Sequence, residues 1–313
     1  MKLVIIEPLG IPKQTLLQLA AERLDDTVEM IYYDTKVTDT AALIERGKDA
    51  DIIAVSNLPL NSDVINGCPN LKMLSIAFTG IDHIDMNACR KRGIVVSNCA
   101  GYSTSAVADL VFGLIVSLHR NIISCNEAIR SGGTRDGLIG YELEGKKFGV
   151  IGTGEIGTKV AKIANAFGCK VYAYSKTLKF IPDVTFTDLD PLLATCDIVS
   201  IHLPLDETTK GLMNKEKLSL MKPTSLLINT ARGPIVDSDA LAEALNSGAL
   251  AGAGIDVFEN EPPIVSNHPL LYAKNLIATP HIAFATKEAL RKRAIIMLNN
   301  IKAYQIGFAQ NVV

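Results

Sequence analysis

The stretch Lys147-Phe-Gly-Val-Ile-Gly-Thr-Gly-Glu-Ile-Gly157 decides the fold that we expect for this chain. An apolar strand over Lys147–Ile151 runs into the spacing Gly152-x-Gly154-x-x-Gly157, and a helical pattern follows. The first glycine allows a tight turn, the second lets the backbone approach a pyrophosphate, and the third lets helix and strand pack closely. The helix N-terminus then offers N–H groups to the phosphates. The spacing in this context predicts a dinucleotide-binding loop.

Apolar runs alternate with helical patterns along the whole chain, in two βα series. Strands are expected in the first series at Lys2–Ile6, Val28–Tyr33, Asp51–Val55, Lys72–Ile76 and Gly93–Val96, and in the second at Lys147–Ile151, Lys170–Tyr174, Asp197–Ile201, Ser225–Asn229, Leu250–Asp256 and Asn275–Ala278. Strands that are apolar throughout and separated by helices favour parallel sheets covered on both faces. We therefore expect an α/β protein with two doubly wound parallel-sheet domains. Long helices are expected over Ser103–Ser131, with Ser103 as N-cap, and over Thr286–Tyr304.

The composition excludes several classes of protein. The 313 residues suit two domains, 48% are apolar, and the formal net charge is -2. This balance gives no reason to expect a nucleic acid or an anionic membrane as partner. The six cysteines form no CxxC pair, so we expect reduced thiols and neither disulfides nor a metal site. The N-terminus does not resemble a secretion signal, and no apolar run approaches the roughly twenty residues of a membrane helix. A soluble, cytoplasmic protein is expected.

The residues that end the strand after the dinucleotide loop bear on the choice of cofactor. An acidic side chain there accepts hydrogen bonds from the ribose of NAD and repels a 2′-phosphate. This chain has no carboxylate there and reads Ser175-Lys176-Thr177, a cation between two hydroxyls. We therefore favour NADP(H) over NAD(H). The alternative is that Lys176 is a solvated loop lysine and that the enzyme uses NADH without an acidic contact.

Arg232, Glu261 and His281 each follow a predicted strand of the second series. Because ligands bind outside the carboxyl ends of parallel strands, the three side chains can converge on one site. A histidine, whose ordinary pKa lies near working pH, can give a proton to a carbonyl oxygen that accepts a hydride. Glu261 would hold the imidazole, and Arg232 would bind a carboxylate and polarise the carbonyl. Taken singly, Arg232 could be a cap or ion-pair arginine and Glu261 a solvated loop acid.

The chain resembles the D-isomer-specific 2-hydroxyacid dehydrogenases over nearly its whole length. The motifs GVIGTGEIG, HLPL, NTARGPIVD, GIDVFENEPP and ATPHIA stand in the order and spacing of that family. The resemblance implies Arg232, Glu261 and His281 as the catalytic set. It implies a cofactor site of Gly152, Thr153, Gly154, Glu155, Ile156, Gly157, Ser175, Lys176, Thr177, His202, Pro204, Thr230, Ala231 and Asp256, with Asp256 beside the nicotinamide.

The resemblance also implies a discontinuous, flavodoxin-like substrate domain, residues 1–99 with 285–313, and a Rossmann NAD(P)-binding domain, residues 100–284. The domains would close over substrate about two connections. Phe78, Thr79 and Gly80 look like the family's substrate loop, where N–H groups hold the substrate carboxylate, although Gly80 alone could be a turn glycine. Tyr102 resembles a substrate-contacting tyrosine but could equally pack at a helix entry. The resemblance also implies a dimer contact at the long helix expected over Ser103–Ser131, so a homodimer is expected.

Departures from the family pattern sharpen the expected function. The pair Ser175-Lys176 resembles the corresponding residues of glyoxylate and hydroxypyruvate reductases that use NADPH. Asp109 stands where many relatives have Glu, and the chain lacks the Trp that is common before the glycine-rich loop. We expect no regulatory domain after Val313, which argues against the long, serine-regulated phosphoglycerate dehydrogenases, and Glu261 argues against the formate dehydrogenase branch. We expect reduction of a small 2-keto acid, with glyoxylate and hydroxypyruvate ahead of pyruvate and branched keto acids. The alternatives are a corepressor-like nucleotide-sensing module on the same fold and a dehydrogenase of a non-keto-acid substrate such as phosphite.

Overall fold

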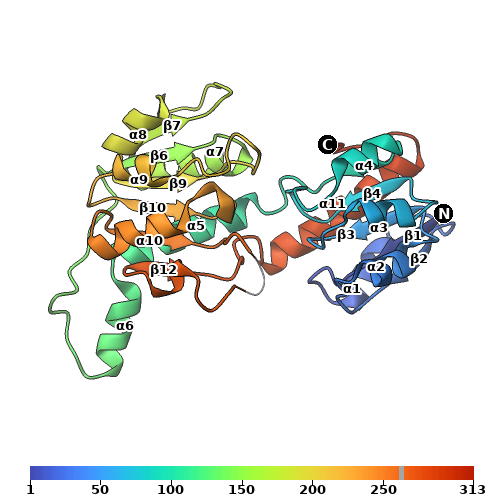
Figure 1. Cartoon of the computed structure of the whole chain (residues 1–313), viewed down its shortest axis with the longest axis horizontal. Helices are drawn as coiled ribbons and strands as arrows, with labels where there is room; N and C mark the ends of the chain where they lie inside the picture. Colours follow the sequence, from blue (N-terminus) through green and yellow to red (C-terminus); the bar gives the residue numbers. More distant parts are fainter. Residues whose placement is uncertain (261–263) are drawn as a thin grey trace. The chain divides into compact units, whose positions relative to one another are not determined.

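The chain forms two compact α/β units, each built on its own parallel sheet (Figure 1). The computed structural model describes residues 1–260 and 264–313. Unit 1 comprises Met1–Ser103 and Ala285–Val313, and unit 2 comprises Thr104–Phe284. Both sheets are parallel throughout. The expected fold class, two parallel-sheet α/β domains, is confirmed.

Unit 1 has a five-stranded sheet in the order β2-β1-β3-β4-β5, the flavodoxin-like order. Its strands are β1 (Lys2–Ile5), β2 (Glu29–Tyr32), β3 (Ile52–Val55), β4 (Met73–Ile76) and β5 (Val95–Ser97). Its helices are α1 (Lys13–Ala21), α2 (Thr40–Gly47), α3 (Ser62–Gly67), α4 (Met86–Lys91) and α11 (Lys287–Gln305). Helix α11 returns from the far end of the chain and buries Met297, Leu298 and Ile301 in this unit.

A buried carboxylate fills the point in unit 1 where the strand order reverses, between β1 and β3. Glu7 follows β1 and is 2% exposed. Its Oε1 accepts hydrogen bonds from the N–H groups of Ser56, Asn57 and Leu58, at 2.8, 3.1 and 3.1 Å. Ligands of doubly wound sheets bind at such a switch point. In unit 1 a side chain of the protein itself takes the N–H groups that a ligand would use.

Unit 2 has a seven-stranded sheet in the order β12-β11-β10-β9-β6-β7-β8, which is the Rossmann order with one added strand. Its strands are β6 (Lys147–Ile151), β7 (Lys170–Tyr174), β8 (Val184–Phe186), β9 (Ile198–Ile201), β10 (Leu226–Asn229), β11 (Gly252–Ile255) and β12 (Leu276–Ala278). Its helices are α5 (Thr104–His119), α6 (Ile122–Arg130), α7 (Glu155–Ala166), α8 (Leu189–Thr195), α9 (Lys215–Ser219) and α10 (Ser238–Ser247), with short 3-10 turns at Gly233–Ile235 and Pro269–Tyr272. The short edge strand β8 is absent from the sequence-based prediction.

Alternate residues of each central strand in unit 2 enter two different cores. Val150 of β6 packs with α5 and α7, and the next residue, Ile151, packs with α8 and α10. Ile198 and Val199 of β9 divide in the same way. Because successive side chains of a strand point to opposite faces, helices on both faces require apolar residues at every position. This explains the unbroken apolar runs of the sequence.

The long helix predicted over Ser103–Ser131 is wrong as one element. The segment forms α5 and α6, bent by 57° at a short break. Asn121 adopts a left-handed conformation there, with φ 50°, which asparagine tolerates better than most residues. Its side chain donates to the carbonyl of Leu138 at 3.3 Å. No single helix among residues 1–260 and 264–313 is long and apolar enough to cross a membrane, whereas this bent pair meets the criterion by length and composition only.

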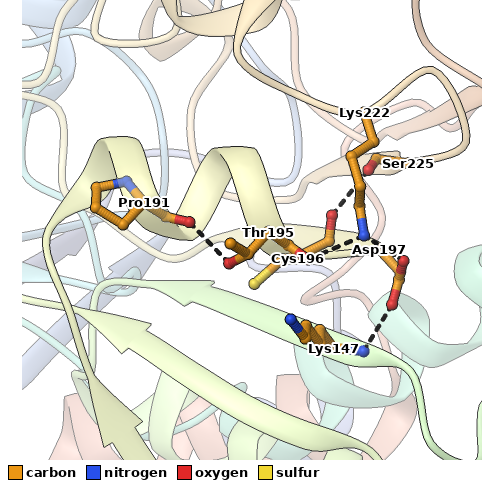
Figure 2. A network of polar contacts seen from close by, with 7 residues as sticks. All are labelled: Lys147, Pro191, Thr195, Cys196, Asp197, Lys222 and Ser225. Carbon is orange, nitrogen blue, oxygen red and sulfur yellow. Dashed lines mark hydrogen bonds and ion pairs between the residues drawn. The ribbon is translucent and has the colours of Figure 1, made fainter.

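A polar network ties together the amino-terminal ends of three strands in unit 2 (Figure 2). The carboxylate of Asp197 accepts from the ammonium of Lys222 and, at 2.8 Å, from the backbone N–H of Lys147. Ser225 donates to the carbonyl of Cys196 at 2.8 Å. Burial raises the pKa of Asp197, but the bonds from Lys222 and Lys147 outweigh it and hold the pKa below its usual value. The network helps to hold β6, β9 and β10 in register at the amino-terminal edge of the sheet, opposite the edge from which the glycine-rich loop starts.

Candidate active site

Six strands of unit 2 end in register along the carboxyl edge of the sheet. Ile151 pairs with both Tyr174 and Ile201, and Asn229 pairs with both Ile201 and Ile255. Ile255 in turn pairs with Ala278 of β12. The loops that begin at Gly152, Ser175, His202, Thr230, Asp256 and Thr279 therefore start along one line. This line is the edge where ligands of such sheets bind.

The glycine-rich loop has the geometry that its spacing predicts. Gly152 adopts φ 95°, and an added Cβ would lie 2.4 Å from the carbonyl oxygen of His202. At Gly157 a Cβ would lie 1.9 Å from the carbonyl oxygen of Gly152, so only glycine lets α7 pack this closely on the turn. A Cβ at Gly154 would meet nothing within 4 Å. The open side of the loop is thus at Gly154.

Two observations indicate that this edge fits a dinucleotide. Helix α7 begins after Gly154 without a side-chain cap, so no capping side chain occupies its first N–H groups, which a phosphate could use. The hydroxyl of Thr230, at the end of β10, is buried and has no hydrogen-bond partner among the described residues. A buried polar atom without a partner costs free energy, which a ligand's hydrogen bond would recover. Gly152–Gly157 and Thr230 would hold the group.

The residues after β7 and β9 flank the glycine-rich loop, because β6 lies between these strands. The ammonium of Lys176 donates to the hydroxyl of Thr208 at 2.6 Å. His202 accepts or donates through Nε2 to the hydroxyl of Ser200 at 2.9 Å, and burial lowers the pKa of His202 to about 3. A neutral imidazole at His202 agrees with the prediction that His202 and Pro204 line the cofactor site.

The loop after β10 is shaped by two residues that sequence reasoning missed. The side chain of Asn229 accepts from the N–H of Ala231 at 3.0 Å and donates to the carbonyl of Arg232 at 2.9 Å. A Cβ at Gly233 would lie 2.1 Å from the carbonyl carbon of Phe258, so the loop after β10 rests directly on the loop after β11. Together these contacts place the backbone of Arg232 at the carboxyl edge. An asparagine that ends an apolar strand is the signal that could have found this arrangement.

Asp256 holds the loop that carries His281. The carboxylate is fully buried and accepts three hydrogen bonds, from the hydroxyl of Thr279 at 2.6 Å and from the N–H groups of Ile282 and Ala283 at 2.8 Å each. His281 lies between these donors, with φ 52°, and its N–H donates to the carbonyl of Asp256 at 2.8 Å. A left-handed histidine persists only where its surroundings fix it.

The same contacts act on the pKa of Asp256. Burial raises the pKa of this carboxyl, and the hydrogen bonds from Thr279, Ile282 and Ala283 offset the rise only in part. Its oxygens face the His281 loop, which makes Asp256 a positioning residue. Direct contact of Asp256 with a cofactor, implied by the family resemblance, stays a prediction.

The first acid of the GIDVFENEPP motif has partners of its own. Glu259 accepts from the hydroxyl of Ser238 at 2.5 Å and contacts Nε2 of the buried His268 at 2.9 Å. Burial raises the pKa of Glu259, but these two bonds outweigh it and lower the pKa. Glu261, the predicted partner of His281, lies outside the described residues. Glu259 is therefore engaged elsewhere, which is compatible with the choice of the second acid.

The predicted substrate loop lies in unit 1, directly after β4. The carbonyl of Phe78 accepts from the N–H of Cys99 at 2.9 Å, and the carbonyl of Thr79 accepts from the side chain of Asn98 at 2.8 Å. Gly80 follows at a partly exposed position. These bonds fix the orientation of the loop's backbone, on which the predicted capture of a carboxylate depends.

Tyr102 is buried in unit 1. Its ring centre lies 6.3 Å from that of Phe78 and 5.6 Å from the guanidinium carbon of Arg293. Burial raises the pKa of Tyr102 to about 12. These contacts favour the packing role over the substrate role, which stays a prediction.

Two cavities lie away from these motifs. One of 570 Å³ is lined by residues of β7, of β8 and of the segment between them, together with Asn165 and Cys169. The other, of 360 Å³, is lined by residues at the end of α5, at the start of α6 and near the starts of β10 and β12, including Leu226 and Leu276. Neither is lined by a predicted catalytic residue. Among the described residues, no cluster of three or more His, Cys, Asp or Glu side chains could hold a metal ion.

Comparison with known proteins decides the family. The model of the D-isomer specific 2-hydroxyacid dehydrogenase NAD-binding domain matches residues 112–283. A glyoxylate reductase of Thermofilum pendens is 42% identical over 272 residues, 84% of this chain and 80% of the relative. The chain belongs to the D-isomer-specific 2-hydroxyacid dehydrogenase family. It is therefore an oxidoreductase that acts on the CH–OH group of 2-hydroxy acids.

Two further relatives of this 2-hydroxyacid dehydrogenase extend over nearly the whole chain. A hydroxypyruvate reductase of Blautia hydrogenotrophica is 36% identical over 298 residues, 91% of this chain and 92% of the relative. An acyclic imino acid reductase, solved in complex with NADPH and D-Arg, superposes with a TM-score of 0.91. It is 31% identical and covers 100% of both chains. The similarity thus extends over both units. The NADPH bound in that relative agrees with a nicotinamide cofactor at the glycine-rich loop of this chain.

Substitution of two glycines is expected to separate folding from cofactor binding. Gly157→Ala forces a clash with the backbone of Gly152 and is expected to destabilise the protein by about 1–3 kcal/mol. Gly154→Ala meets open space and is expected to change stability by less than about 1 kcal/mol, yet it places a methyl group where a pyrophosphate would approach. Urea unfolding and titration of cofactor fluorescence measure the two effects. Equal stability losses in both variants would contradict this account of the loop.

Asp256→Asn is expected to destabilise the protein by about 1–3 kcal/mol, because the amide NH₂ would face an N–H donor and leave it unsatisfied. Asp237→Asn is the matched control. Asp237 caps α10 by accepting from the N–H of Ala240, and asparagine caps equally well, so little change is expected. Urea unfolding midpoints measure both. A loss at Asp256 no larger than at Asp237 would remove its role as the anchor of the His281 loop.

Proposed function

We propose that this 2-hydroxyacid dehydrogenase reduces a small 2-keto acid, glyoxylate or hydroxypyruvate before others, with NADPH, and that the 2-hydroxy acid product has the D configuration wherever it is chiral. The proposal rests on the arrangement of the carboxyl edge of the sheet in unit 2. There Asp256 holds the loop of His281 through hydrogen bonds, and Gly233 lets the loop of Arg232 pack directly on the loop after β11. The names of the relatives support the substrates, since they include glyoxylate and hydroxypyruvate reductases.

A nicotinamide cofactor held by Gly152–Gly157 and Thr230 would supply the hydride that the carbonyl carbon accepts. The imidazole of His281 gives a proton to the carbonyl oxygen, and the same ring accepts it back in the oxidative direction. The guanidinium of Arg232 pairs with the substrate carboxylate and stabilises the negative charge that develops on the carbonyl oxygen. Glu261 is the acid that this proposal assigns to the imidazole. The engagement of Glu259 with Ser238 and His268 supports this choice between the two acids.

The N–H groups of the Thr79–Gly80 loop bind the substrate carboxylate. Support comes from the bonds of Asn98 and Cys99, which hold the carbonyls of this loop. For the cofactor, Ser175, Lys176 and Thr177 present one cation and two hydroxyls at the end of β7, and a structural relative was solved with NADPH. Phosphate binding by such a group is favoured over binding of a ribose hydroxyl.

Initial rates test the proposal. NADPH and NADH oxidation is measured with glyoxylate, hydroxypyruvate, pyruvate and a branched keto acid, for the wild type and for His281→Ala. We expect turnover that prefers NADPH and falls by about 10²–10⁴ in the variant, the usual contribution of a general acid. A preference for NADH would overturn the cofactor assignment alone. Tight cofactor binding without any keto-acid turnover would favour the nucleotide-sensing module.

We also propose a homodimer, in which α6 contributes to the interface. No residue of α6 is buried within the chain, and Ile122, Ile123 and Ile129 are 46%, 48% and 71% exposed. Exposed apolar side chains that gather on one helix favour an interface. Light scattering at micromolar concentration is expected to give twice the chain mass, and Ile129→Glu is expected to shift it toward the monomer. A monomeric mass of the wild type would end this proposal.

A further inference from the structure

A chain of side-chain contacts links the loops on either side of the glycine-rich loop. Lys176 follows β7, and its ammonium donates to the hydroxyl of Thr208 at 2.6 Å. That hydroxyl donates in turn to the carboxylate of Asp206, also at 2.6 Å. Asp206 and Thr208 lie in the loop after β9, on the other side of β6. The cation that would receive a 2′-phosphate therefore shares its partner with an acid.

Asp206 is held firmly in this position. Its Oδ1 accepts from the N–H groups of Thr208 and Thr209 at 2.8 and 3.0 Å, and its own N–H donates to the hydroxyl of Thr209 at 2.8 Å. Thr209 is buried and donates to the carbonyl of Pro204 at 2.7 Å. The hydrogen bonds from Thr208, and also the charge of Lys176, lower the pKa of Asp206. A fixed, ionised carboxylate thus stands near the ammonium of Lys176.

The location of this acid matters for the choice of cofactor. In dinucleotide folds, the acid that accepts from the ribose hydroxyls and repels a 2′-phosphate follows the second strand. Here the residues that follow that strand, β7, are Ser175-Lys176-Thr177 without an acid, and the carboxylate of Asp206 is linked to Lys176 through Thr208, from the loop after β9. Its negative charge offsets part of the attraction of Lys176 for a phosphate. Both groups are exposed to water, so the effect is moderate.

We propose that Asp206 is a specificity-determining residue of this enzyme, which acts through Thr208 and Lys176 to limit the preference for a 2′-phosphorylated cofactor. The inference rests on the proposed function in one respect, that Lys176 faces the 2′-position. Asp206→Asn keeps the oxygen that accepts in the turn and removes the charge. It raises affinity for a 2′-phosphate by about two- to five-fold, the range of exposed ion pairs.

Calorimetric titration with two probes, adenosine 2′,5′-bisphosphate and AMP, isolates the effect, because the probes differ only in the 2′-phosphate. The Kd for AMP divided by the Kd for the bisphosphate, a ratio that grows with preference for the 2′-phosphate, is measured for the wild type, Asp206→Asn, Lys176→Gln and the double variant. Glu207→Gln is the matched control, since it removes the same charge from the neighbouring exposed residue. Asp206→Asn is expected to strengthen bisphosphate binding and to leave AMP binding unchanged, whereas Glu207→Gln leaves the ratio close to that of the wild type.

The double variant tests whether Asp206 acts on the 2′-phosphate through Lys176. If Asp206 acts through Lys176, its substitution has little further effect once Lys176 is glutamine. An equal gain in both backgrounds, an equal change for both probes, or the same gain from Glu207→Gln overturns the inference. A ratio that falls in Lys176→Gln but is unmoved by Asp206→Asn refutes the inference and leaves the proposed NADPH preference standing. A ratio unmoved by Lys176→Gln refutes the NADPH assignment itself.

Discussion

The register of the parallel sheet in unit 2 is the constraint on which the functional edge depends. Ile151, Tyr174, Ile201, Asn229, Ile255 and Ala278 end their strands along one continuous set of pairs. Each following loop starts from that line, although the loops are separated by up to about 130 residues in sequence. A shift of one residue in any strand would turn its alternating side chains to the opposite core. The two apolar cores therefore hold the register, and the register gathers the motifs.

Close backbone contacts convert this alignment into a defined surface. Gly157 against Gly152 brings the start of α7 onto the turn, and Gly233 against Phe258 brings two neighbouring loops into direct contact. In both places a methyl group would separate backbone segments that are now in contact. The glycines thus determine how near the helix N-terminus and the Arg232 loop come to the edge. They supply no chemistry themselves.

Carboxylates organise the polar parts of the protein in three different ways. Asp256 is buried and holds the backbone of the His281 loop through three hydrogen bonds. Glu7 in unit 1 occupies the N–H groups of its own sheet's switch point, so the corresponding position in that unit is filled by the protein. Asp206 is exposed and touches a lysine only through a threonine. Burial determines whether such an acid fixes the backbone or adjusts the local charge.

The sequence by itself determined the fold class, the glycine-rich loop and the family, because these depend on local patterns. Apolar runs, turn residues and the spacing of three glycines can all be recognised in short segments of the sequence. It also placed Arg232 and His281 after strands, but it could not show what holds them. The roles of Asn229, Gly233, Asp256 and Asp206 depend on partners far away in sequence or on bonds that only the folded backbone creates.

The break between α5 and α6 is a similar case. The apolar pattern continues through Asn121, whose left-handed backbone and bond to Leu138 belong to the folded structure. Tertiary structure alone decided these features, because hydrogen bonds and close contacts between distant segments form only when the sheet is assembled.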